Sequence, residues 1–210
     1  SDVAKSGGPP VRRVIQSLEA LRCVVCDLLS GGAVQIDLAG HSFGGYLMAR
    51  LASRCEREGL AVRRVVLLAP GGPVIDQNPK PSTMRLLNDP MGEIDSHKPW
   101  WVPAAPLKMA ATCALGVMLS PNNCNTLIGL EFAEYLGHKD FGTRHPTLLL
   151  WGDNDDIAQP RQAEPLGRYL RSHFPHLEAL WIRGGSHNIQ IDSAITVARA
   201  MDTWLRGGSA

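Results

Sequence analysis

The sequence has almost no excess of charge of either sign. Its 21 lysine and arginine residues are balanced by 20 aspartate and glutamate residues, which gives a net charge of +1, and no long run of one sign occurs. Proteins that bind a nucleic-acid backbone or an anionic membrane surface usually carry a marked basic excess. We therefore expect no nucleic-acid partner and no membrane surface as a ligand.

Long apolar runs are missing as well. The longest apolar stretches are too short or too interrupted to cross a bilayer, so the sequence predicts no transmembrane segment. The first ten residues, SDVAKSGGPP, contain one lysine and no hydrophobic segment, and we recognise no secretory signal in them. We expect an intracellular setting, either the cytoplasm or the interior of an organelle.

Cysteine is scarce and odd in number, which indicates reduced thiols and fits an intracellular setting. The five cysteines are Cys23, Cys26, Cys55, Cys113 and Cys124. Cys23 and Cys26 form a C-x-x-C within a helical pattern, and no second pair at ligand spacing supports zinc. The acidic stretch that starts at Asp153 has Ala158 where a calcium-binding EF-hand loop needs glycine. We expect no metal and no cofactor.

What is present is the composition and patterning of a globular α/β domain. Of the 210 residues, 44% are hydrophobic and 20% are charged, which suffices for one domain with a substantial core. Apolar periodicity predicts strands over 33–39, 62–70, 146–152 and 177–182, and helices over 9–29, 43–58, 160–174 and 194–205. Strands that alternate with helices over short links predict a mostly parallel sheet flanked by helices.

Residues 71–145 interrupt this alternation. They hold eight prolines and few β-branched runs, with helical patterns near 102–120 and 124–137. We interpret 1–70 and 146–210 as the α/β core and 71–145 as an inserted helical lid.

The stretch LAGHSFGGYL, which begins at Leu38, lies between a predicted strand and a predicted helix. It contains a G-x-S-x-G pattern formed by Gly40, Ser42 and Gly44. When this pattern joins a strand to a helix, the serine lies on a sharp, strained turn, and the glycines let the two elements approach closely. Ser42 is therefore a candidate nucleophile. The alternative is a structural turn in which Ser42 only caps the helix.

A serine nucleophile needs a basic histidine, which in turn needs an orienting carboxylate. In this topology the acid follows the serine in the chain and the histidine comes last. Three aspartates follow the predicted strand 146–152, namely Asp153, Asp155 and Asp156. His187 follows the last predicted strand, at the same edge of the sheet. The other six histidines are less well placed, and we expect His41, inside the turn, to point away from the site.

These pieces resemble the α/β-hydrolase fold superfamily, in its serine esterase, lipase and thioesterase branches. The resemblance rests on GHSFGG, VVLLAPGGP, HPTLLLWGDNDDIAQP and GGSHNIQID, and it covers nearly the whole chain except the lid. It implies that Ser42 is the nucleophile, Asp155 the acid and His187 the general base, with the backbone N–H of Phe43 as one oxyanion donor. It also implies a lid-lined hydrophobic pocket, for which we name Trp100, Trp101 and Met118; the alternative for these three is packing within the lid.

One departure from the superfamily concerns the region before Ser42. Members normally begin with several strands and a His-Gly loop that supplies a second oxyanion donor, and neither pattern precedes Ser42 here. We therefore interpret the chain as a partial fold, which a complementing N-terminal segment or chain could complete. The strand before Ser42 would then have an unpaired edge, and its Gln35 and Asp37 give it unusual polarity.

The resemblance implies a serine hydrolase of lipid metabolism that cleaves a carboxylic ester or thioester of a small-molecule or acyl-chain substrate. Related thioesterases often carry the acid where Ala69 stands, which favours an esterase or lipase. His187 and Asp192 form an H-x-x-x-x-D pattern, so an acyltransferase-like relative is one alternative. A catalytically impaired pseudoenzyme or fragment, or another chemistry on the same fold, is a further alternative.

Overall fold

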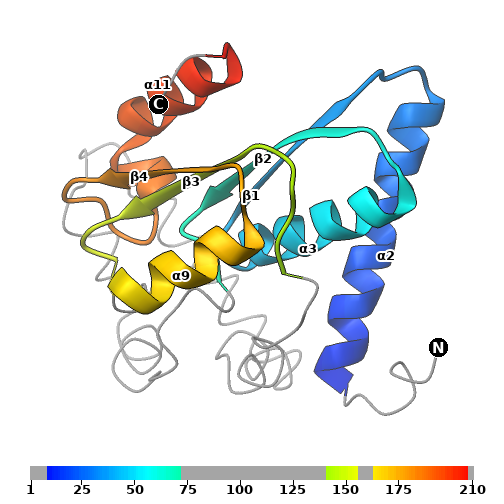
Figure 1. The fold of residues 1–210 in the computed structure, drawn as a ribbon, viewed down its shortest axis with the longest axis horizontal. Helices are drawn as coiled ribbons and strands as arrows, with labels where there is room; N and C mark the ends of the chain where they lie inside the picture. The colour runs from blue at the N-terminus through cyan, green and yellow to red at the C-terminus, as the bar shows by residue number, and fades with distance from the viewer. Residues whose placement is uncertain (1–8, 72–140, 156–162, 208–210) are drawn as a thin grey trace, which may run out of the picture.

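The computed structural model describes residues 9–71, 141–155 and 163–207 of the chain. Within these residues the centre is a four-stranded parallel sheet in the order β1-β2-β3-β4 (Figure 1). The strands are β1 (Ile36–His41), β2 (Val62–Leu68), β3 (Thr147–Gly152) and β4 (Leu177–Ile182). The helices are α2 (Pro9–Ser30), α3 (Phe43–Glu58), α9 (Ala163–His173), α10 (Ile189–Asp192) and α11 (Ala194–Leu205). The prediction of a parallel sheet flanked by helices is confirmed.

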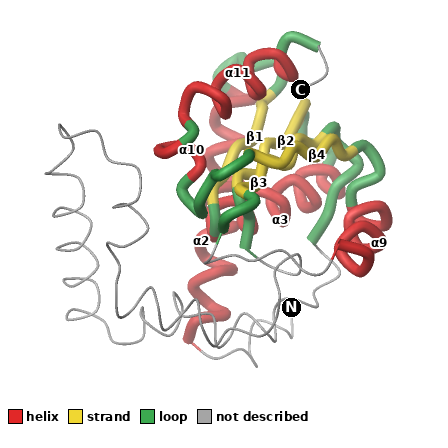
Figure 2. The backbone as a smooth tube through the Cα atoms, turned by 90° about the vertical axis from the view of Figure 1, so that its left-hand side faces the viewer, coloured by secondary structure: helices red, strands yellow, loops and turns green. Residues whose placement is uncertain are grey.

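Helices cover both faces of this sheet. Figure 1 shows α11 on one side and α3 and α9 on the other, and Figure 2 gives the same layers from the side. Neighbouring residues of β2 face opposite ways, so that Val65 and Leu67 pack with α3 while Val66 packs with α11. All six residues of β3 are buried. Strands that are apolar on both faces are typical of parallel sheets.

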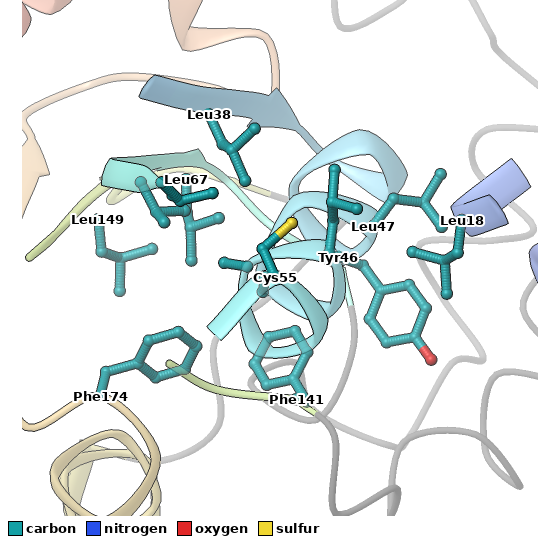
Figure 3. Packing of buried hydrophobic residues seen from close by; sticks show 14 of the residues in the cluster. Leu18, Leu38, Tyr46, Leu47, Cys55, Leu67, Phe141, Leu149 and Phe174 are labelled. Carbon is teal, nitrogen blue, oxygen red and sulfur yellow. The ribbon is translucent and has the colours of Figure 1, made fainter. Parts of the chain in front are cut away.

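The larger core lies between the sheet and helices α2, α3 and α9. In Figure 3, leucines of β1, β2 and β3 face the side chains of α3, with Phe141 and Phe174 closing the cluster. The ring of Phe141 lies 5.7 Å from that of Tyr46 and 5.5 Å from that of Phe174. Phe141, in the segment before β3, thus packs between helix α3 and the end of helix α9.

The first strand begins three residues later than the periodicity predicts. Ala33 donates its N–H to the carbonyl of Leu28, and Gly32 donates to Leu29. Gly32 has a φ of 101°, the left-handed conformation that glycine adopts readily where a helix ends. These bonds belong to the C-terminal cap that follows α2. The N–H of Ala33 is therefore bonded to the helix end, and the strand begins later, at Ile36.

The polarity of β1 has a structural explanation in a cross-strand ion pair. β1 is one of the two terminal strands of the sheet in the part of the chain that is described, and its Asp37 binds Arg63 of β2 through two hydrogen bonds. The guanidinium of Arg64 lies 3.8 Å from the same carboxylate. An exposed carboxylate at this position binds the arginines of the neighbouring strand.

Among the described helices, none is both long and apolar enough to cross a membrane.

Replacing Arg64 with methionine should lower the free energy of unfolding by about 1–3 kcal/mol. Arg64 Nη1 donates to the carbonyls of Trp204 and Leu205 at 3.1 and 2.6 Å, and so caps the C-terminus of α11. Its guanidinium also lies 5.6 Å from the centre of the Trp204 ring. Urea denaturation measures the effect.

Arg63→Met is the matched control, because its side chain is 49% exposed and its partner is a surface carboxylate. Such pairs contribute about 0–1 kcal/mol. Equal losses in the two variants would contradict the role of Arg64 as a helix cap.

Candidate active site

Ser42 occupies the turn between β1 and α3, because β1 ends at His41 and α3 begins at Phe43. Its φ of 51° and ψ of −121° are strained for a residue other than glycine, at a cost of about 1–3 kcal/mol. Hydrogen bonds hold this geometry: the N–H of Ser42 donates to Leu68, and its carbonyl accepts from Tyr46 and Gly71. The turn therefore fixes the serine at the carboxyl edge of the sheet.

Close packing of the turn depends on Gly40. A Cβ atom on Gly40 would lie 2.7 Å from the backbone nitrogen of Gly45 and 2.5 Å from the carbonyl carbon of Gly44, closer than real Cβ atoms approach. A Cβ on Gly44, by contrast, would meet nothing within 4 Å in the described segments. The sterically demanding glycine of the predicted pair is thus Gly40.

The structure brings Ser42, His187 and Asp155 together. His187 Nε2 lies 2.8 Å from Ser42 Oγ, and His187 Nδ1 lies 2.9 Å from Asp155 Oδ2. The side chain of Asp155 is fully buried and that of His187 is 7% exposed. A carboxylate accepts hydrogen bonds, so Nδ1 carries the proton and the lone pair of Nε2 faces the serine hydroxyl. Ser42 makes no helix-capping hydrogen bond with its side chain.

The two other acid candidates differ in placement. Asp153 is exposed, and its Oδ1 accepts the N–H of Gly184 at 2.6 Å, which joins the loop after β3 to the loop after β4. Asp156 lies outside the described residues. Of the two aspartates described, Asp155 is the one in contact with the histidine.

Trp151 is a site residue that no sequence pattern had indicated. Its Nε1–H donates to Asp155 Oδ2 at 3.0 Å, the same oxygen that accepts from His187. Trp151 is the fifth residue of β3 and is 1% exposed, so its ring is fixed in the core. A buried strand tryptophan needs a partner for its N–H, and this requirement is the signal that could have found it.

Hydrogen bonds between neighbouring residues stabilise the loop that carries His187. Asp192 Oδ2 accepts the N–H of Ser186 at 2.9 Å, and Ser186 Oγ accepts the N–H of Asn188 at 3.1 Å. Helix α10 follows directly, and the periodicity did not predict it. Asp192, which formed the H-x-x-x-x-D pattern, thus contacts the backbone of the histidine loop.

The loops after β3 and β4 also touch at backbone level. A Cβ on Gly152 would lie 2.6 Å from the carbonyl oxygen of Ser186, the residue before His187. The absence of a side chain at Gly152 therefore lets the loop that carries the acid meet the loop that carries the histidine.

His41 departs from expectation. It lies beside the site, and its Nε2 is 2.9 Å from the carbonyl oxygen of His187. We expected it to point away, because the sequence pattern gives no information on which loop crosses the end of β1.

The two remaining predicted features are the oxyanion donor and the lid pocket. Phe43 is the first residue of α3, and the N–H groups of a helix's first turn point beyond the helix start, where an oxyanion could accept them. Its oxyanion role stays a prediction. The predicted pocket residues lie outside the described residues, namely Trp100, Trp101 and Met118.

Metal-binding chemistry has no candidate in the described part of the chain. No group of three or more His, Cys, Asp or Glu side chains gathers there in a way that could hold an ion. Cys23 is exposed and Cys26 is half-buried, both with free thiols.

The fold and the site can be compared with known proteins. Among solved structures, a thermophilic esterase from Thermogutta terrifontis is 21% identical, with 87% of this chain and 68% of that chain covered and a TM-score of 0.56. A monoacylglycerol lipase from Paleococcus ferrophilus is 20% identical, with coverages of 91% and 74% and a TM-score of 0.53. A type II thioesterase of the yersiniabactin pathway is 20% identical, with coverages of 89% and 72% and a TM-score of 0.52.

These likenesses show a shared fold at low identity. A search of curated protein sequences found no match. A family model described as the alpha/beta hydrolase family matches residues 6–200, which is most of the chain. The chain therefore belongs to the alpha/beta hydrolase family.

Proposed function

We propose that this protein is a serine hydrolase that cleaves a carboxylic ester or thioester through an acyl-enzyme on Ser42. The observation that carries the proposal is the continuous chain of hydrogen bonds from Ser42 Oγ through the His187 ring to Asp155. A serine hydroxyl becomes a competent nucleophile when a positioned imidazole takes its proton and a carboxylate stabilises the resulting imidazolium.

The reaction would run in two halves. Ser42 Oγ attacks the acyl carbon as its proton passes to His187 Nε2, and the N–H of Phe43 donates to the oxygen that becomes negative. The intermediate then collapses, and the leaving alcohol or thiol takes the proton from His187. In the second half His187 takes a proton from water, whose oxygen attacks the acyl carbon, and the carboxylic acid leaves as Ser42 Oγ recovers its proton. Asp155 stays ionised throughout.

The proposal includes a second oxyanion donor from a segment or chain that complements β1. Loss of one donor typically costs about 10²–10³ in rate, or about 3–4 kcal/mol. β1 is one of the two end strands of the described sheet and the one that leads into Ser42, so we expect the further strand to pair with it. Activity of this chain with and without such a complement is therefore expected to differ by about that factor.

Two contacts bear on the alternatives of acyl transfer and of a thioesterase-type acid position. An acyltransferase-like reaction would need an acceptor other than water, and Asp192, which suggested it, binds the backbone of Ser186. A thioesterase-type acid after β2 would stand at Ala69, whereas His187 binds Asp155 after β3. The contact of Asp192 removes the reason to expect an acyl acceptor other than water, and the contact of His187 favours an acid on the loop after β3.

A fluorophosphonate probe tests the proposal, because it reacts covalently with activated serines. We expect it to modify the folded chain, with the adduct located on Ser42 by peptide mass spectrometry, and to leave Ser42→Ala unmodified. Absence of labelling in a folded sample would reject the proposal in favour of an impaired enzyme. A panel of esters and thioesters of increasing acyl length would then identify the substrate class.

Replacing Trp151 with phenylalanine should slow labelling by about tenfold, which corresponds to about 1.4 kcal/mol. The variant keeps a ring in the core but removes the N–H that donates to Asp155 Oδ2. The rate constant of labelling, measured beside the free energy of unfolding, checks this expectation.

Trp181→Phe is the matched control, because Trp181 is 46% exposed and its ring stacks on that of Trp151, with the ring centres 6.1 Å apart. If both tryptophan variants slowed labelling equally, the indole N–H of Trp151 would have no special part in the site.

A further inference from the structure

His41 links the serine-bearing turn to the histidine loop. It is the last residue of β1 and precedes Ser42, so its backbone position is set by the same turn. Its Nε2 lies 2.9 Å from the carbonyl oxygen of His187, a residue 146 positions later in the chain. The centres of the two imidazole rings are 4.8 Å apart, with the rings tilted by 49°. One turn therefore holds both the candidate nucleophile and a contact to the backbone of the candidate base.

The hydrogen bonds of His41 define its protonation. The carbonyl oxygen of His187 accepts only, so Nε2 must donate the proton. On the other side of the ring, the side-chain amide nitrogen of Gln190 lies 3.4 Å from Nδ1, and an amide nitrogen donates only. With the Gln190 amide in this orientation, Nδ1 accepts and the ring is neutral, with its proton on Nε2.

The electrostatic surroundings agree with a neutral ring. Burial lowers the pKa of His41 below its ordinary value, and the neighbouring His187 lowers it further. The hydrogen bond to the His187 carbonyl and, less strongly, the carboxylate of Asp155 raise the pKa, but the effect of burial is larger than either. A neutral His41 places no positive charge beside His187, where an imidazolium must form during the reaction.

We propose that His41 is a positioning residue that holds the His187 loop over Ser42 by donating a hydrogen bond to the His187 carbonyl. This inference rests on the proposed function. A proton acceptor works only within hydrogen-bond reach of the hydroxyl, and a misplacement of 1 Å can cost about 10²-fold in rate. His41 adjoins Ser42, so a shift of the turn moves both residues together. The hydrogen bond from His41 then moves the His187 loop with the turn, which preserves the distance of 2.8 Å between His187 Nε2 and Ser42 Oγ.

The decisive comparison is between His41→Gln and His41→Leu. Glutamine can place an amide N–H near the position of Nε2, whereas leucine is of similar size and has no donor. We expect His41→Leu to lower the rate constant of fluorophosphonate labelling, and kcat for a nitrophenyl ester, by about 10–100-fold with little change in KM. His41→Gln should recover the rate to within about threefold of the unmodified protein. His176→Leu, an exposed histidine, is the control and should leave the rate unchanged.

Urea denaturation of each variant separates positioning from loss of fold. The proposal is overturned if folded His41→Leu reacts like the unmodified protein, or if folded His41→Gln is as slow as His41→Leu. A rate loss that tracks only the free energy of unfolding would also overturn it.

A second readout does not depend on activity and distinguishes this inference from the proposed function. Nitrogen-15 NMR of the imidazole rings at neutral pH should show His41 with its proton on Nε2, and the ring signals of His187 should change in His41→Leu and persist in His41→Gln. A protein that fails to react with the probe but shows these signals would reject the proposed function alone. A His41 with its only ring proton on Nδ1 would reject the positioning role, because Nε2 could then donate no hydrogen bond to the His187 carbonyl.

Discussion

Replacing Asp155 with asparagine should lower the rate of Ser42 labelling by about 10⁴-fold, or about 5 kcal/mol. Asp155 accepts the Nδ1–H of His187 at 2.9 Å and, being buried, cannot be replaced by water. An asparagine amide can instead donate to Nδ1, which moves the ring proton to Nε2 and leaves no lone pair for the serine proton. The substitution also removes the negative charge that stabilises the imidazolium in a site with little solvent.

Asp153→Asn is the matched control for this experiment. Asp153 lies two residues away, is exposed, and accepts a backbone N–H from Gly184, which asparagine can still do. We expect its labelling rate to stay within about threefold of the unmodified protein. Stopped reactions followed by mass spectrometry give both rates. If Asp153→Asn were the slower variant, the acid would have been assigned to the wrong aspartate.

Replacing Gly40 with alanine should destabilise the protein by about 3 kcal/mol or more and abolish labelling of whatever fraction remains folded. The added Cβ would fall 2.7 Å from the backbone nitrogen of Gly45, and backbone atoms cannot move aside as a flexible side chain can. Relief of the clash requires α3 to move away from β1, and such a movement changes the strained backbone of Ser42. Urea denaturation and probe labelling measure the two effects.

Gly44→Ala provides the comparison within the same motif. A Cβ there meets no described atom within 4 Å, and Gly44 is the second residue of α3, where alanine is favoured over glycine by about 1 kcal/mol. We expect unchanged or slightly higher stability. Equal destabilisation at both glycines would mean that close packing of Gly40 does not define the turn.

The sequence patterns predicted the elements well where periodicity and end signals agree. Leu177–Ile182 and Ala194–Leu205 have the predicted bounds, and α3 runs from Phe43 to Glu58 as the apolar spacing requires. The predicted start of β1 was wrong. The cap at Gly32 extends the hydrogen bonds of α2 to Ala33, which the periodicity had assigned to the strand. The periodicity also gave no sign of α10, since four residues are too few to show a helical period.

The predicted candidate residues Ser42, Asp155 and His187 lie together in the structure, although their catalytic roles stay proposals. Their order along the chain and their positions after strands could be read from the sequence because parallel strands bring their carboxyl ends to one edge. The choice among aspartates within four residues rested on resemblance, because composition and spacing do not distinguish them. Burial and direction of the side chain do, and both depend on packing around β3.

The sequence by itself determined the class of fold, the order of its elements and the edge of the sheet at which serine, acid and histidine meet, because these follow from local periodicity and chain order. Only the tertiary structure decided that Trp151 donates to Asp155, that Gly152 admits the loop of His187, and that His41 lies within hydrogen-bond distance of the His187 carbonyl. These contacts join residues that no local pattern relates, since they arise where separate loops pack against one another.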